Sequence, residues 1–82
     1  MVNIRPINVP IKGTATKMNV LVLNFATNAT TCTTYWQLFT SDDSLVIDGN
    51  YELTPEQFAT WGQDNNYVNQ CVANAINVTI IP

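Results

Sequence analysis

The sequence contains no histidine, and only 11% of its 82 residues are charged, against about 25% in an average globular protein. Without histidine, the chain lacks the side chain most often used for acid–base catalysis near neutral pH and for zinc or haem binding. Its two cysteines, Cys32 and Cys71, do not form a Cys-x-x-Cys motif and allow one disulfide at most. We expect two small buried thiols in a reducing compartment, with a disulfide as the alternative. The sequence therefore predicts no metal, no cofactor and no small-molecule substrate.

Long apolar runs are also missing, since none approaches the roughly 20 residues of a membrane-spanning helix. The opening MVNIRPINVP carries prolines and polar residues where a signal peptide would have its apolar stretch, so we expect no secretory signal. A net charge of −3 does not neutralise a phosphate backbone, which argues against nucleic acid as a partner. The length favours one small domain, residues 1–82, which is marginal unless assembly supports it.

The few charges are segregated along the chain. The three basic residues end at Lys17, and the six acidic residues begin at Asp42. A basic arm and an acidic body favour head-to-tail contacts between copies or docking on different neighbours, and chance is the alternative in a chain with so few charges. The remaining polar surface is neutral and rich in Asn and Thr, which makes it easier to desolvate than a charged surface.

Residues 1–13 predict an extended arm. Pro6, Pro10 and Gly13 oppose a helix, and apolar residues alternate with polar ones toward Ile11. A proline-bearing strand belongs at a sheet edge or in an arm that leaves the body, and a frayed terminus is the alternative.

Residues 14–53 predict an antiparallel meander. Residues 17–25 form a continuous β-favouring run, as in a strand covered on both faces. Gly49, between Asp48 and Asn50, suits a tight turn with positive φ. The expected strands cover residues 17–25, 31–40, 45–48 and 51–53.

The second of these strands carries aromatic side chains on both faces, with Trp36 on one side and Tyr35 and Phe39 on the other. Trp36 and Trp61 either anchor an interface or fill the core, and a chain this small favours the core. A carbohydrate-binding surface is a weaker alternative. The expected protein interface takes apolar and aromatic residues from the arm, this strand and the tail: Ile4, Ile7, Val9, Ile11, Tyr35, Trp36, Phe39, Ile80 and Ile81.

Residues 54–77 predict two helices. Thr54 caps the first, Pro55 occupies its first position, Gln57 closes a capping box and Gly62 ends it. Asp64 caps the second helix. Its apolar face is expected to lie on the sheet and includes Tyr67, Val68, Cys71, Val72, Ala75 and Ile76. Residues 78–82 are expected to form a tail or a last strand. Such a strand is able to pair with a neighbouring copy.

The acidic residues do not suggest an active site. Asp42 and Asp43 lie in a loop without the spacing of a calcium site. Glu52 and Glu56 flank a helix start, where negative charge is favourable. Neither pair has a histidine, lysine or cysteine nearby in the sequence, so we expect no enzymatic activity and no catalytic residue.

The segment DGNYELTPEQFATWGQDNNYV, residues 48–68, resembles small structural proteins of tailed bacteriophages, in which a strand "dG-x-x-x-lt" leads into "x-x-q-y/f-x-x-W-G-x-D-D/N-x-Y-v". The upstream VPIKGTATKMNVLVLNF and YWQL also resemble the opening strands of that family. Asn65 departs from the pattern, where a second aspartate is often found, and this weakens a cation-binding role for the acidic pair. The matching residues are Gly49, Leu53, Thr54, Gln57, Phe58, Trp61, Gly62, Asp64, Tyr67 and Val68.

The resemblance implies a virion component without enzymatic activity, made in the host cytoplasm and assembled with copies of itself and with other virion proteins of the tail, baseplate, neck or capsid. The alternative is a small binding or regulatory module outside the virion, such as an inhibitor or adaptor of a host or phage protein. The expected fold is α+β: a four- to five-stranded antiparallel meander, one short and one longer C-terminal helix on one face, and an extended N-terminal arm.

Overall fold

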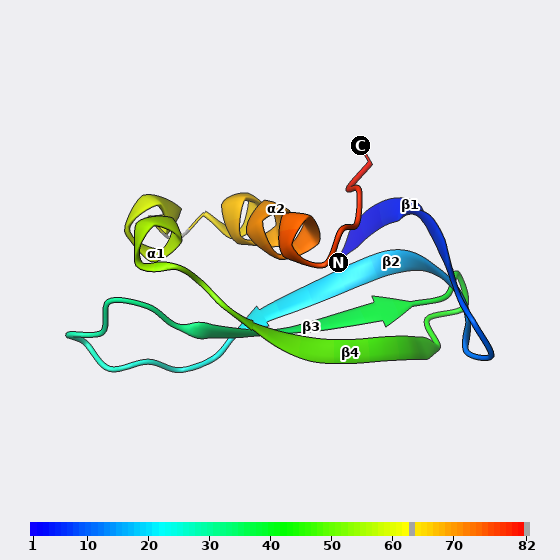
Figure 1. The fold of residues 1–82 in the computed structure, drawn as a ribbon, viewed down its shortest axis with the longest axis horizontal. Helices are drawn as coiled ribbons and strands as arrows, with labels where there is room; N and C mark the ends of the chain where they lie inside the picture. The colour runs from blue at the N-terminus through cyan, green and yellow to red at the C-terminus, as the bar shows by residue number, and fades with distance from the viewer. Residues whose placement is uncertain (63, 82) are drawn as a thin grey trace.

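The structure is a computed structural model that describes residues 1–62 and 64–81. A four-stranded antiparallel sheet runs in chain order, and two helices lie above one of its faces (Figure 1). The predicted fold class is therefore confirmed. The elements are β1 (Val2–Val9), β2 (Gly13–Val22), β3 (Thr33–Phe39), β4 (Leu45–Glu52), α1 (Pro55–Trp61) and α2 (Asn65–Ala75).

The N-terminal segment is an edge strand of the sheet, which was one of the two placements that its prolines allow. β1 pairs with β2 from Val2 opposite Met18 to Val9 opposite Gly13. The register shifts between Asn3 and Ile7. This irregular stretch contains Pro6, whose missing N–H is tolerated in a bulge or at an edge.

The C-terminal tail closes part of the outer edge of β1. Ile4 and Ile80 form an isolated antiparallel bridge. The Arg5 N–H donates to the Thr79 carbonyl over 2.8 Å, and the Ile81 N–H donates to the Asn3 carbonyl over 3.0 Å. The tail therefore pairs within its own chain; Pro82 lies outside the described residues.

Gly49 corrects the expectation of a tight turn. β4 continues through it as one strand, and Gly49 pairs with Trp36 of β3. A Cβ atom at position 49 would lie 2.6 Å from Cζ2 of the Trp36 indole. The glycine is needed for the close approach of this ring, and no turn forms there.

Three predicted helix ends, at Thr54, Gly62 and Asp64, are confirmed, while α2 ends at Ala75, two residues before the predicted end of the helical segment. The Gln57 N–H donates to the Thr54 hydroxyl over 3.1 Å, and the Thr54 N–H donates to the Gln57 side-chain carbonyl over 3.0 Å, which completes the capping box. Gly62 ends α1 with a left-handed φ of 51°. Asp64 caps α2 by accepting from the Asn66 N–H over 3.0 Å.

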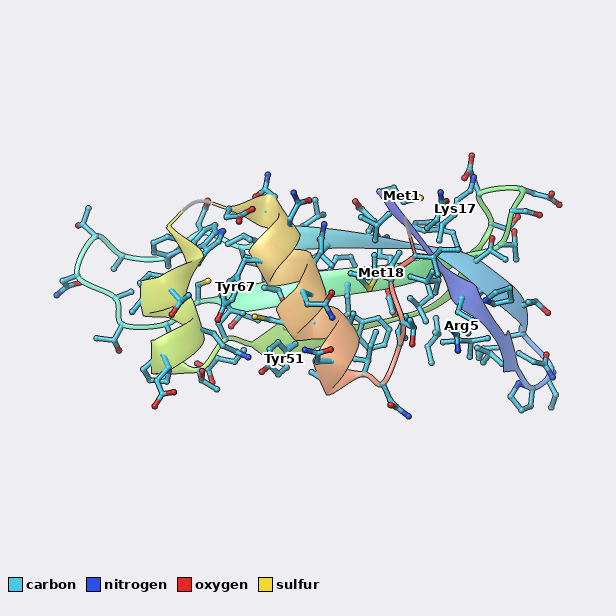
Figure 2. All side chains as sticks on the ribbon, turned by 90° about the horizontal axis from the view of Figure 1, so that it is seen from above. Met1, Arg5, Lys17, Met18, Tyr51 and Tyr67 are labelled. Carbon is cyan, nitrogen blue, oxygen red and sulfur yellow. The ribbon has the colours of Figure 1, made fainter. Side chains whose placement is uncertain are left out.

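The core lies between the helices and the sheet. In the view from above the helices, Met18 lies between α2 and β1 (Figure 2). Met18 and Val72 are fully buried, and both cysteines are buried free thiols, as expected. The buried hydrophobic residues are Ile4, Ala15, Met18, Cys32, Leu38, Val46, Leu53, Trp61, Val68, Cys71, Val72, Ala73 and Val78.

β2 ends at Val22, three residues earlier than predicted, and the chain beyond it brings Phe25 onto α1. The Phe25 and Phe58 rings meet edge to face with centroids 5.1 Å apart. Trp61 contacts the Phe25 ring at 6.1 Å. This aromatic cluster ties the β2–β3 loop to α1, and edge-to-face pairs of this kind are favourable.

Candidate protein-interaction surfaces

The nine predicted interface residues do not form one surface. Ile4 is only 1% exposed and belongs to the core, which is a correction: it shares the strand face of Val2, which is paired with the buried Met18. Ile11 is fully exposed, and Ile81 is 38% exposed. The others are half-buried and are Ile7, Val9, Tyr35, Trp36, Phe39 and Ile80.

Ile11 stands at the tip of the β1–β2 hairpin, at the end of the molecule opposite the β2–β3 loop (Figure 1). Its φ is 70°, which is uncommon for a β-branched residue. The Lys12 N–H closes the turn on the Val9 carbonyl over 3.0 Å. The tip therefore exposes an apolar side chain at the cost of local backbone strain.

The sheet face away from the helices is open and mostly neutral. Asn19 donates to the Gln37 side chain across the β2–β3 pair over 3.3 Å. The Tyr35 hydroxyl donates to the Asp48 carboxylate across the β3–β4 pair. Leu21 is 49% exposed beside Tyr35. This face combines amides with apolar surface.

The hydrogen bond to Asp48 is the largest cause that raises the pKa of Tyr35 above its usual value, followed by desolvation and by the charge of Asp48. Burial raises the pKa of the Cys32 thiol. For Tyr67, desolvation is the main cause of a raised pKa, and a hydrogen bond and charge from Cys71 add to it. Each of these shifts favours the neutral form of its group.

The basic and acidic parts of the chain meet at the end of the molecule that carries the β3–β4 turn. The Lys17 ammonium lies 2.7 Å from the Asp43 carboxylate, with exposed side-chain fractions of 29% and 67% (Figure 2). An ion pair this exposed contributes little stability. Basic and acidic residues that are far apart in the sequence are therefore in contact in the folded chain.

Part of β2 is an open strand edge. Pairing with β1 begins at Val2 opposite Met18, so residues 19–22 have a strand partner only on the β3 side among the described residues. The Leu23 N–H donates to the Thr33 carbonyl over 3.0 Å, and groups alternate along an antiparallel pair. Val20 and Val22 therefore direct their main-chain N–H and C=O groups toward the open side.

A hollow of about 710 Å³ lies along this open edge, which the sequence did not predict. Trp61 and the first turns of α2 line it on the helix side, and Met1 lines it at the start of β1. None of the described side chains that line it carries a charge. The lining residues are Met1, Met18, Asn19, Val20, Leu21, Val22, Leu23, Asn24, Phe25, Trp61, Asn65 and Asn69.

Trp61 is only 6% exposed, which confirms the prediction that this tryptophan fills the core. Its indole Nε1 is buried and has no acceptor within residues 1–62 and 64–81. A buried donor without an acceptor is costly, by about 1–3 kcal/mol. This nitrogen belongs to the same tryptophan that lines the hollow.

The outer edge of β4 differs from the β2 edge. Because the Leu53 N–H donates to the Cys32 carbonyl, the alternating residues Asp48, Asn50 and Glu52 direct their main-chain groups away from β3. Two of these three residues are acidic. Charges at an edge discourage pairing with another strand.

No group of three or more potential metal ligands occurs within residues 1–62 and 64–81. In the same part of the chain, neither helix has the length and apolar character needed to cross a membrane. Comparison with protein-family models, with curated proteins and with solved structures gave no match. The arrangement of the described residues is suited to main-chain pairing and apolar contact with another protein.

Proposed function

We propose that this protein is a non-enzymatic structural component of a bacteriophage virion, which acts by assembling with neighbouring virion proteins and with copies of itself. The resemblance over residues 48–68 supports the virion assignment. The observation that carries the assembly mechanism is the open edge of β2 beside a neutral, partly apolar hollow. Strand edges of this kind are templates for pairing with another chain.

The distribution of exposed apolar side chains supports the same proposal. Single exposed hydrophobic residues are normal on any protein, but Met1, Leu21, Leu23 and Phe25 all line one hollow. The low charge of the chain reduces the desolvation cost of covering this surface. The remaining large exposed hydrophobic residues are Ile11, Leu45, Ile47 and Ile81.

The virion proposal is tested by quantitative mass spectrometry of gradient-purified particles from the phage that encodes the chain. We expect the protein at a constant ratio to the other structural proteins, in every particle fraction and after a high-salt wash. Image reconstruction of the same particles then locates it in the tail, baseplate, neck or capsid.

The matched comparison is the cleared lysate from the same infection. A binding or regulatory module outside the virion would be found there and not in the particles. That result, together with a purified protein that stays monomeric at millimolar concentration in native mass spectrometry, would contradict the virion proposal. Loss of a measurable activity on removal of a single carboxylate would contradict the non-enzymatic assignment.

A further inference from the structure

We propose that the open edge of β2 binds an extended, uncharged segment of a neighbouring protein, which joins the sheet as an added strand beside residues 19–23. The identification of that neighbour as a virion protein rests on the proposed function. The chemistry of the bound segment rests on the edge and hollow alone.

The main chain of the edge is prepared for a strand. β1 covers β2 only as far as Met18, and the alternation along β2 directs the N–H and C=O groups of Val20 and Val22 to the uncovered side. An added strand would satisfy these groups with ladder hydrogen bonds, as in strand addition at other sheet edges.

This edge also lacks the features that normally prevent pairing. β1 carries a proline and a register shift, and the tail pairs with part of it. β4 carries Asp48 and Glu52 and has a register shift of its own. Residues 19–23 have no charge, no proline and no register shift in the pairing of residues 19–22 with β3. Only the β2 edge is left suitable for another strand among the described strands.

The walls of the hollow specify an uncharged segment. Val20, Val22 and Trp61 provide apolar contacts, while Asn65 and Asn69 provide amides on the helix side. Because side chains of a strand alternate between two faces, every second residue of the segment would face these walls. A charged residue there would lose hydration without gaining a charged partner among the lining side chains, which is unfavourable. Val, Ile, Thr and Asn fit this environment.

The indole of Trp61 offers one further contact. Its Nε1 is a buried donor without an acceptor among the described residues, and the same side chain lines the hollow. A main-chain carbonyl of the added strand is an acceptor of the required kind. A small rotation of the indole would be needed for the contact, because the nitrogen is covered in the free protein.

The β4 edge of a second copy is a poorer occupant than a neutral segment of a different protein, because it presents Asp48 and Glu52. Pairing β4 with the β2 edge would bring these two carboxylates toward a hollow whose described lining has no cation among its side chains. The desolvation cost of such unpaired charges favours a neutral partner segment. The β2 edge of a second copy is uncharged but offers only residues 19–22, since Met18 is already paired with β1. Pairing of two copies through their β2 edges is the outcome that the dependence of amide exchange on protein concentration detects.

The test uses the full-length protein and an array of eight-residue peptides that alternate Val or Ile with Thr or Asn. Matched peptides carry the same residues in a non-alternating order, Lys or Glu at the apolar positions, or Pro at every second position. We expect the alternating neutral peptides to bind and each matched set to bind at least tenfold more weakly. Hydrogen exchange followed by NMR should then show at least tenfold slower exchange of the Val20 and Val22 amides.

Two lysine substitutions on α2 locate the binding site. Asn69→Lys places a charge in the wall of the hollow, and Asn66→Lys places the same charge on the same helix at an exposed position outside the lining. We expect Asn69→Lys to weaken binding of the best peptide at least tenfold and Asn66→Lys to change it less than twofold. Thermal unfolding of both variants establishes that they are folded before they are compared.

The proposal is overturned if no alternating peptide binds at 1 mM, or if both lysine variants bind alike. It is also overturned if the Val20 and Val22 amides become protected by raising the protein concentration alone, because the occupant would then be a second copy. Absence of the protein from purified particles leaves these results unaffected, so that outcome counts only against the virion assignment.

Discussion

Replacing Gly49 with alanine tests the closest packing contact of the sheet. The added Cβ would lie 2.6 Å from Cζ2 and 3.0 Å from Cε2 of Trp36, where ordinary contacts are 3.4–4 Å. Gly49 and Trp36 are direct partners in the β3–β4 pair, so their backbones are held in register. The indole must therefore move away from β4 to admit the methyl group.

The expected net destabilisation is about 1 kcal/mol, and at most about 2.5 kcal/mol. Overpacking of this kind costs about 1–3 kcal/mol. Alanine recovers about 0.5–1 kcal/mol of this, because glycine loses more backbone freedom when it is ordered in a strand. For a domain of this size, a net change of about 1 kcal/mol corresponds to a fall in the melting temperature of about 4–8 °C.

The assay is a double-mutant cycle in chemical denaturation, with Gly49→Ala measured in the natural chain and in a Trp36→Leu background. Without the indole, we expect Gly49→Ala to be neutral or slightly stabilising. If position 49 instead required a positive φ, as a tight turn would, alanine would be destabilising by the same amount in both backgrounds. That equality would refute the close-packing explanation.

Three further predictions follow from the described contacts. Thr54→Ala removes the cap of α1 and should lower the free energy of unfolding by about 1 kcal/mol, while Thr54→Ser should restore it, as measured in urea. The raised pKa of Tyr35 means that its neutral form stabilises the fold, so this contribution should be lost as pH rises above about 10. Between pH 8 and 11, the melting temperature should therefore fall less steeply with pH for Tyr35→Phe than for the natural chain. Equal slopes of melting temperature against pH would contradict the role of the hydrogen bond to Asp48. Asp43→Asn, which breaks the exposed ion pair with Lys17, should change stability by less than about 1 kcal/mol at any salt concentration.

Local sequence signals predicted the helical half of the fold accurately. The capping box at Thr54 and Gln57, the glycine at position 62 and the cap at Asp64 each depend on residues within one helical turn. Their hydrogen bonds join residues that are close in the sequence, so sequence spacing alone is enough to identify them.

Non-local packing explains where the sequence was misleading. Gly49 resembles a turn residue beside Asp48 and Asn50, but its conformation is determined by an indole from the neighbouring strand. Ile4 was expected in the same apolar surface as Ile7, but residues three apart point to opposite faces of a regular strand. Ile4 shares the face of Val2, whose partner Met18 lies in the core. Neither the contact with the ring nor the choice of the buried face is visible in a local pattern.

The open β2 edge could not be predicted from a local pattern either. It depends on how two strands of different length, β1 and β2, are aligned. β1 and β2 are joined by a tight hairpin, and their pairing runs from Val9 opposite Gly13 to Val2 opposite Met18. The remaining residues of β2 are apolar and β-favouring, as in a strand covered on both faces. Within the described chain they have a strand neighbour on one side only. An uncharged, β-favouring segment at a partial edge agrees with our proposal that a strand of a neighbouring protein pairs there.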